Sequence, residues 1–362
     1  MLYHLLYSFR DLFFGFNVFR YITVRAGLGA VTAFLFCVIF GPWFIRKLRA
    51  GKIGEEAFKP HCGRIYAAQK EKQGKPTMGG VLIIAAIVFA VVLWGDLGSP
   101  YILLALLSLL WLGLVGFRDD YLKWSGIAPG GLRAKDKLLW QGLLALVIAG
   151  LLFWGGDFST IVDVPFLKNL AWDIGAFYVL LIILVVVASS NAVNITDGLD
   201  GLAIGSVTMV ALFYCLLSYV SGHYAFSKYL LIPHIPLAGE LTVFCAAVFG
   251  ASLGFLWFNC YPAEIFMGDT GSLALGGALG TIAVLIKKEL LLGIVGMVFV
   301  FEAFSVIMQV VGFKLTGRRI FDMAPLHHHF QIRGWNENKI IVRFWIVGII
   351  FIICTLMTLK LR

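Results

Sequence analysis

Long apolar runs recur along this 362-residue chain from residue 26 to the C-terminus, and no other feature of the sequence restricts the fold as much. The uncharged or nearly uncharged runs span residues 26–45, 78–95, 101–117, 138–156, 174–190, 202–220, 241–260, 273–286, 290–313 and 344–359. A helix that crosses a bilayer needs roughly 20 apolar residues, and the run 273–286 is the weakest candidate. The sequence therefore predicts an all-α, polytopic membrane protein with about ten transmembrane helices, in a single domain over residues 1–362.

Composition excludes a soluble fold and argues against a nucleic-acid partner. Of the residues, 60% are hydrophobic and 14% are charged, whereas soluble domains are about half apolar and a quarter charged. The net charge is +9, but the Lys and Arg residues lie mostly in three loops between apolar runs. Basic loops of this kind indicate membrane orientation, so we expect no nucleic-acid binding. The six cysteines show no CxxC spacing, and no zinc site is expected.

The three basic loops also predict the topology. They follow the first, third and ninth apolar runs, at 46–75, 118–137 and 314–343, and hold most of the 29 Lys and Arg residues. Alternate loops share one side of the membrane, and the basic loops of bacterial membrane proteins face the cytoplasm. The turns 191–201 and 261–272 then share the cytoplasmic face, and an even number of spans leaves both termini periplasmic.

Five aspartates lie at or beside the ends of apolar runs on this predicted cytoplasmic face. They are Asp119, Asp120, Asp197, Asp200 and Asp269. Ionised acids are costly there without partners, and adjacent carboxylates repel each other, so their coexistence implies neighbouring lysines, raised pKa values or a divalent cation. Oxygen ligands and phosphate are typical of Mg²⁺ sites, which indicates phosphoryl chemistry. The alternative is a set of interfacial residues that only end the spans, and five acids on one face make it the weaker interpretation.

Glycines and lysines accompany these acids. Segments 77–80, 196–201 and 268–272 each place glycine just before an apolar run. Glycine allows close backbone approach, and a helix N-terminus offers unpaired N–H groups to phosphate. Nearby lysines of the basic loops are Lys72, Lys75, Lys123, Lys135 and Lys137. The combination is suited to a site that holds a metal and a diphosphate.

Three consecutive histidines, 327–329, lie in the last basic loop. They cannot all face one metal ion from a regular helix or strand. A pair of metal ligands and a single histidine that donates to phosphate or transfers a proton remain alternatives.

Six segments in order along the chain carry a resemblance to a known family. They are PTMGG at 76–80, DDY at 119–121, NAVNITDGLDG at 191–201, FLWFN at 255–259, FMGD at 266–269 and MAPLHHH at 323–329. Together they resemble the phospho-N-acetylmuramoyl-pentapeptide transferase family of the polyprenyl-phosphate N-acetylhexosamine-1-phosphate transferase superfamily. The paired aspartates and segment 191–201 are typical of the superfamily, whereas PTMGG and the three histidines point to this member.

The resemblance implies a reaction, a cofactor and a location. The enzyme would transfer phospho-N-acetylmuramoyl-pentapeptide from its UDP carrier to undecaprenyl phosphate, releasing UMP and forming lipid I for peptidoglycan synthesis. It would use Mg²⁺ at the cytoplasmic face of the bacterial inner membrane, within one transferase domain, and would form a homodimer.

The resemblance also implies roles for individual residues. Asp269 would bind the metal, Asp119 and Asp120 would activate or organise the lipid phosphate, and His327 or His328 would lie at the sugar-peptide end. The implied catalytic residues are Asp119, Asp120, Asp269 and His327. The implied substrate-binding residues are Lys72, Thr77, Lys123, Lys137, Asn194, Asp197, Asp200, Asn259, Phe266, His328 and His329, of which the three lysines would contact phosphates.

Two other functions compete with this interpretation. A related N-acetylglucosamine-1-phosphate transferase has the same metal chemistry, but the histidine loop argues against it. A cation-coupled transporter would carry acids near mid-span and on both sides, whereas these five share one face. Glu302, inside the run 290–313, is an intramembrane acid that a helix break there would expose to water, and we leave it outside the expected site.

Overall fold

The computed structural model describes residues 2–11, 13–51, 74–155, 158–164 and 171–359. In these residues nine helices are long and apolar enough to cross a membrane. They are α2 (Ile22–Ala50), α5 (Pro100–Trp124), α6 (Ala134–Trp154), α7 (Tyr178–Thr196), α8 (Leu202–Gly222), α10 (Ala238–Asn259), α11 (Gly268–Leu285), α13 (Met297–Thr316) and α15 (Glu337–Thr358). A tenth apolar helix, α4 (Gly80–Trp94), has 15 residues. The prediction of an all-α polytopic membrane protein is confirmed.

Shorter elements connect these helices. They are α1 (Leu2–Ser8), η1 (Phe14–Arg20), η2 (Gly175–Phe177), α9 (Tyr224–Leu230), α12 (Glu289–Val295), α14 (Leu326–Ile332) and an antiparallel pair of strands, β1 (Ile161–Asp163) and β2 (Ala171–Asp173). The apolar run 290–313 is therefore two helices, α12 and α13, which Gly296 separates.

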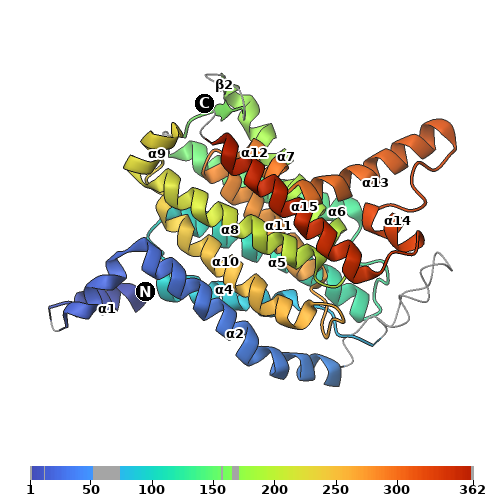
Figure 1. The fold of residues 1–362 in the computed structure, drawn as a ribbon, viewed down its shortest axis with the longest axis horizontal. Helices are drawn as coiled ribbons and strands as arrows, with labels where there is room; N and C mark the ends of the chain where they lie inside the picture. The colour runs from blue at the N-terminus through green and yellow to red at the C-terminus, as the bar shows by residue number, and fades with distance from the viewer. Residues whose placement is uncertain (1, 12, 52–73, 156–157, 165–170, 360–362) are drawn as a thin grey trace.

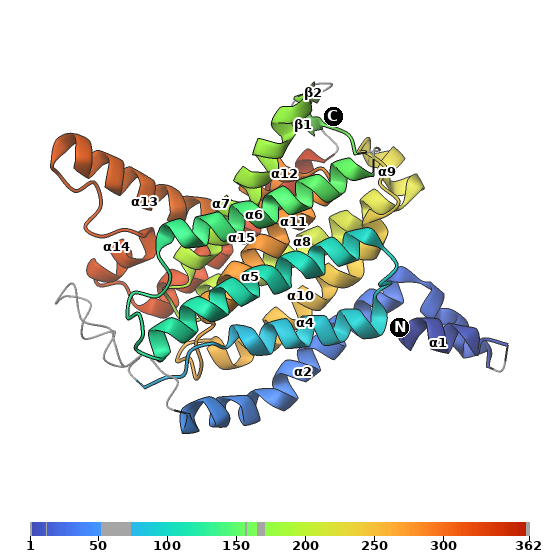
Figure 2. The same ribbon diagram turned by 180° about the vertical axis from the view of Figure 1, so that it is seen from behind.

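Helix α11 forms the centre of the bundle. Figure 1 shows α8, α10 and α15 across one face, and Figure 2 shows α4, α5 and α6 across the opposite face, with α2 and α13 at the two edges. The most apolar 18-residue window of α11 is 89% buried. The corresponding run was the weakest span predicted from the sequence, yet the helix is the most deeply buried of the nine long apolar helices described.

The small residues of α11 explain its central place. Any side chain at Gly276 or Gly280 would overlap Ser189 on α7, and one at Gly277 would overlap Leu112 on α5. Small residues let membrane helices approach closely and pack without a hydrophobic driving force. The start of α11 is thereby fixed between the ends of α5 and α7.

The ends of the helices alternate between the two ends of the bundle. Glu337, at the start of α15, accepts a hydrogen bond from the Asp200 N–H (2.9 Å), whereas Arg25, near the start of α2, pairs with Glu240 at the start of α10 (2.6 Å). Helix α10 runs from Glu240 at one end of the bundle to the loop that contacts Asp200 at the other end. Helix α2 therefore begins at the Glu240 end, and α15, which begins at the Asp200 end, finishes at the Glu240 end. Both terminal helices thus reach the same end of the bundle, as the even number of spans predicts.

Candidate active site

Three carboxylates meet where α5 ends and α11 begins. Asp119 and Asp120 lie in the last turns of α5 and Asp269 in the first turn of α11, and one oxygen from each lies within 4.8 Å of the others. Any side chain at Gly116, one turn before Asp120, would overlap the backbone of Asp269. Glycine at this position therefore allows α5 and α11 to approach each other closely. The structure therefore brings together three of the five predicted aspartates.

Asp120 holds the first turn of α11. The backbone N–H groups of Asp269 and Thr270 donate to its two carboxylate oxygens (3.1 and 2.9 Å), and the Thr270 hydroxyl donates as well (2.6 Å). The first N–H groups of a helix have no partner within the helix, and an acid there also complements the helix dipole. Asp120 therefore caps α11 from α5 and positions the neighbouring Asp269.

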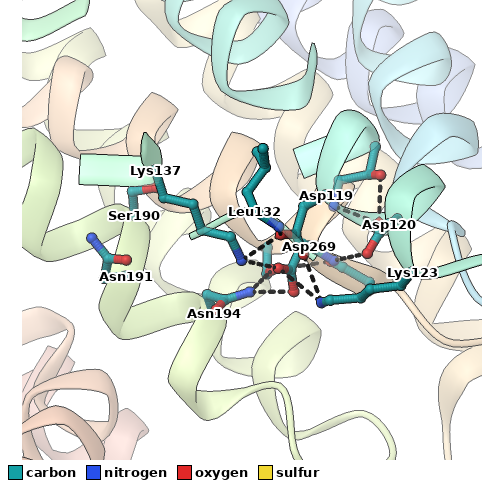
Figure 3. Close-up of polar contacts among 12 residues, drawn as sticks. Asp119, Asp120, Lys123, Leu132, Lys137, Ser190, Asn191, Asn194 and Asp269 are labelled. Atoms are coloured by element: carbon teal, nitrogen blue, oxygen red, sulfur yellow. Dashed lines mark hydrogen bonds and ion pairs between the residues drawn. The ribbon is translucent and has the colours of Figure 1, made fainter. Parts of the chain in front are cut away.

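Two lysines lie between Asp119 and Asp269. The Lys123 ammonium is 2.6 Å from Asp119 and 3.2 Å from Asp269, and the Lys137 ammonium is 3.0 and 2.6 Å from the same two carboxylates. Asp119, fully buried, also accepts a hydrogen bond from the Leu132 N–H (2.6 Å). Figure 3 shows both lysines pointing toward Asp269. These ion pairs supply the partners that the buried acids require.

Asn194 completes the surroundings of Asp269 from α7. Its side-chain amide donates to Asp269 (2.9 Å) and to the Ser272 hydroxyl (2.8 Å), as Figure 3 shows for the first contact. Asp269 is therefore contacted from α5, α6 and α7 together.

The donor set at this site fits a hard divalent cation. Three carboxylates, counted as ionised, face two ammonium groups, which leaves one negative charge uncompensated. Carboxylate oxygens in a compact group are the ligands that Mg²⁺ prefers. Asp119, Asp120 and Asp269 together are therefore a group that could hold such an ion.

Other predicted site residues join the neighbouring loops to each other. Asp200, 2% exposed, accepts a hydrogen bond from the Ala263 N–H (3.0 Å). Asn259 accepts from the Gly201 N–H (3.1 Å) and donates to the Ile265 carbonyl (2.8 Å). These side chains therefore hold the 197–201 and 260–267 loops side by side.

The segment that contains Thr77 pairs with the segment that contains Phe266. The Phe266 N–H donates to the Pro76 carbonyl (2.9 Å), and the Gly79 N–H donates to the Phe266 carbonyl (2.9 Å). Thr77, Asp197 and Phe266 are half-buried at this end of the bundle. Lys72 lies outside the described residues.

The three histidines have different neighbours. His327 is fully buried, and its Nε2 lies so close to Gly198 that any side chain at Gly198 would overlap it. His328 Nδ1 is 2.7 Å from the Gln331 side-chain oxygen, and His329 Nδ1 accepts a hydrogen bond from the Asp322 N–H (3.1 Å). The close approach of His327 to Gly198 brings α14 against the 197–201 loop.

Glu302, which the sequence left outside the expected site, contacts His327. A helix break at Glu302 would have let it reach water, but the break lies at Gly296, and Glu302 is fully buried. Its carboxylate lies 3.0 Å from His327 Nδ1 and accepts a hydrogen bond from the His327 N–H (3.2 Å). The signal that pointed to it was its charge within an apolar run.

The central part of the chain matches a known family. Residues 100–287, which contain the carboxylate cluster, match the family described as glycosyl transferase family 4. The fold and the site thus define a multi-pass membrane transferase.

Curated bacterial relatives match the whole chain. Proteins named phospho-N-acetylmuramoyl-pentapeptide-transferase are 48% identical in Syntrophus aciditrophicus, 50% in Citrifermentans bemidjiense and 50% in Pelobacter propionicus, each over 100% of both chains. The chain belongs to the phospho-N-acetylmuramoyl-pentapeptide-transferase family.

Proposed function

We propose that this protein transfers phospho-N-acetylmuramoyl-pentapeptide from UDP-N-acetylmuramoyl-pentapeptide to undecaprenyl phosphate, yielding lipid I and UMP. The observation that carries the proposal is the contact of Asp269 with Lys123, Lys137 and Asn194 beside two further aspartates. Full-length identity of about half to relatives with this activity in their name supports the choice of substrate.

In the proposed reaction a lipid phosphate oxygen forms a bond to the sugar-linked phosphorus. The bond from that phosphorus to the oxygen of UMP breaks, and UMP leaves with that oxygen. Such transfers depend mainly on positioning and on neutralisation of phosphate charge. Mg²⁺, held by Asp269 with Asp119 and Asp120 beside it, would neutralise charge on the diphosphate when bound.

The lysines would act on the phosphates directly. Lys123 and Lys137 each contact two carboxylates, and Lys123 is partly exposed at the end of α5. Their ammonium groups can turn toward the diphosphate without leaving the site, and Lys72 is proposed to join them. Asp119 would accept the proton of the lipid phosphate.

The remaining predicted residues would bind the rest of the substrate. We assign the nucleotide end to Asn194 on α7, Asn259 at the end of α10, and Asp197 and Phe266 in the adjoining loops. Thr77 and Asp200 would also contact the substrate. The sugar-peptide end would lie at α14, with His327 catalytic and His328 and His329 contacting substrate.

The proposal includes a setting. The site would face the cytoplasm of a bacterium from its inner membrane, residues 1–362 would act as one transferase domain, and the protein would form a homodimer. Light scattering of the solubilised protein measures the last point.

One assay tests the proposed function. Purified protein is given undecaprenyl phosphate and UDP-N-acetylmuramoyl-pentapeptide, with Mg²⁺ or with a chelator, and UMP and the lipid product are measured. Mg²⁺-dependent release of both is expected. UDP-N-acetylglucosamine serves as the matched control, and turnover of that sugar alone would identify the related transferase instead.

A further inference from the structure

Gln141 lies in the membrane-spanning part of α6 with every polar atom of its side chain engaged. It is fully buried; its amide donates to the Ser190 hydroxyl (3.1 Å) and accepts from the Asn191 side chain (2.8 Å). Ser190 in turn donates to the backbone carbonyl of Leu273 on α11 (3.2 Å). A single polar group thus connects α6, α7 and α11 through hydrogen bonds.

These bonds repeat the catalytic contacts one helical turn deeper. In each helix, a residue of this buried group lies four positions from a residue of the candidate active site. The pairs are Lys137 with Gln141 on α6, Asn194 with Ser190 on α7, and Asp269 with Leu273 on α11. We call Lys137, Asn194 and Asp269 the site layer, and Gln141, Ser190 and the Leu273 carbonyl the support layer. Residues four apart lie on one helix face, about 5 Å along the axis, so the layers are stacked.

Figure 3 shows the relation on α7, where Asn194 points to Asp269, and Ser190 and Asn191 lie on the other side of Asn194, farther from Asp269. Lys137 also points to Asp269 in this view, beside Asn194. The position of both donors therefore depends on how α6 and α7 are set against α11.

The support layer restricts the position of α6 and α7 against α11, because its buried polar groups cannot replace a lost hydrogen bond with one to water. If α6 slides or rotates against α7, the Gln141 amide loses both partners in an apolar surrounding, which costs free energy. An apolar side chain in its place packs equally well in several registers, since membrane helices gain little from burying more apolar surface. The amide thus selects one register rather than adding general stability.

We propose that Gln141 is a positioning residue for the transfer reaction: it holds α6 and α7 in the register that places Lys137 and Asn194 on Asp269. The expected change in kcat rests on the proposed function. The expected change in Mg²⁺ binding at Asp269 does not, because it is measured without turnover.

The test compares Gln141→Leu with a control of equal burial. Thr281→Val removes a buried hydrogen bond between α11 and α5, from the Thr281 hydroxyl to Ser108 (2.9 Å), three turns from Asp269. For each protein, kcat and KM for UDP-N-acetylmuramoyl-pentapeptide are measured. The thermal midpoint is titrated with Mg²⁺ in the presence of UMP.

Gln141→Leu is expected to lower kcat by about 10- to 100-fold, because displacement of catalytic groups by about 1 Å costs this much. It should also raise the Mg²⁺ concentration at half-maximal stabilisation, while Thr281→Val changes neither quantity. Ser190→Ala should resemble Gln141→Leu, and the double variant should be no worse than either, since both act through one hydrogen bond. If Gln141→Leu does not fold, Ser190→Ala is scored on the same two quantities.

Two outcomes overturn the proposal. One is a wild-type enzyme that is active while Gln141→Leu and Ser190→Ala match Thr281→Val in kcat and in Mg²⁺ midpoint. The other is an unchanged Mg²⁺ midpoint in both support-layer variants. If the wild type transfers no phospho-sugar at all, the proposed function fails, but the Mg²⁺ midpoints still decide whether the support layer positions Asp269.

Discussion

The Glu302 carboxylate lies 3.0 Å from Nδ1 of His327, and both side chains are fully buried. Glu302 belongs to α13 and His327 to α14, so the contact joins α13 to the short helix that follows it in the chain. A carboxylate at Nδ1 accepts the proton on that nitrogen, which leaves Nε2, on the Gly198 side, as the free acceptor. Glu302 therefore sets both the orientation and the tautomer of His327.

This contact predicts graded effects of substitution at residue 302. Glu302→Ala should lower kcat by about 10- to 100-fold, because His327 loses the group that orients it and a displaced catalytic group costs about this much. Glu302→Gln should lower it less, because its carbonyl oxygen still accepts from Nδ1. Steady-state kinetics measures the effect, and the thermal midpoint of each variant shows that it is folded. Ser305→Ala, a buried change one turn along α13, is the control. Equal activity of the wild type and Glu302→Ala would show that Glu302 does not position His327 for the reaction.

Asp269→Asn should nearly abolish turnover and leave the fold intact. The substitution removes the carboxylate that Lys123, Lys137 and Asn194 contact, and with it the best-placed oxygen for Mg²⁺. UMP release is measured over a range of Mg²⁺ concentrations, together with the thermal midpoint. Asp173→Asn, on the exposed β2 strand, is the control for loss of a charge. Wild-type turnover by Asp269→Asn at limiting Mg²⁺ would contradict the metal assignment.

Some of these features were readable from the sequence because local residue patterns carry them. Apolar runs predicted the helices, and acids at the ends of the runs predicted the cluster of Asp119, Asp120 and Asp269, since alternation places those ends on one side. The contact of Glu302 with His327 joins segments 25 positions apart and leaves no local pattern. The same holds for Gln141, a single uncharged polar residue within an apolar run.

The break between α12 and α13 was not predicted either. Gly296 interrupts the helix, but the residues on both sides are continuously apolar, so hydropathy alone shows one span. The span at α11 was predicted, but as the weakest one, because the glycines that allow close packing make this central helix the least hydrophobic of the nine long apolar helices in the described residues. Hydropathy reports contact with lipid better than contact between helices.

At the end of the bundle opposite the site, Glu289 predicts a pH dependence of stability. Burial raises its pKa from 4.5 to about 8. The Tyr178 hydroxyl donates to it, the neighbouring Lys288 pairs with Asp163 (2.6 Å), and the Lys287 ammonium lies against the Tyr178 ring. The folded protein keeps the Glu289 proton where the unfolded chain has lost it. Its contribution is therefore full below pH 4.5 and is lost as the pH rises to about 8.

Glu289→Gln isolates this contribution. The thermal midpoint of the wild type minus that of Glu289→Gln should fall as the pH rises from 4.5 to about 8. Burial lowers the pKa of Lys287 to about 7, which acts in the opposite direction above that pH but is present in both proteins. A difference that stays constant with pH, or that rises, would show that Glu289 is ionised in the folded state.

Cysteine labelling tests the orientation of the bundle. In a chain whose six native cysteines are replaced, Gly130→Cys, in the exposed loop between α5 and α6, should react with a membrane-impermeant thiol reagent only from the cytoplasmic side. Ala225→Cys, exposed on α9, should react only from outside. Labelling of Gly130→Cys in intact cells would place the candidate active site on the wrong face for a UDP-linked substrate.

The surroundings of Asp119 bear on the reaction route. Its oxygens contact the Leu132 N–H (2.6 Å), the Lys137 ammonium (3.0 Å) and the Lys123 ammonium (2.6 Å), and the side chain is fully buried. As a covalent nucleophile, Asp119 would have to leave these partners and approach a phosphorus among other acids. The lipid phosphate is already an anionic nucleophile, so direct attack needs positioning and charge neutralisation but no protein nucleophile.

Direct attack predicts that enzyme freed of polyprenyl phosphate neither releases UMP nor exchanges labelled UMP into the UDP-sugar. A covalent phospho-sugar enzyme would do both and would follow ping-pong kinetics. Delipidated protein is needed, because copurified carrier lipid would produce exchange by the direct route, and added undecaprenyl phosphate should restore both reactions. A burst of UMP equal to the amount of delipidated enzyme, absent in Asp119→Asn, would establish the covalent route, because only a bond to that carboxylate accounts for one UMP per enzyme without an acceptor lipid.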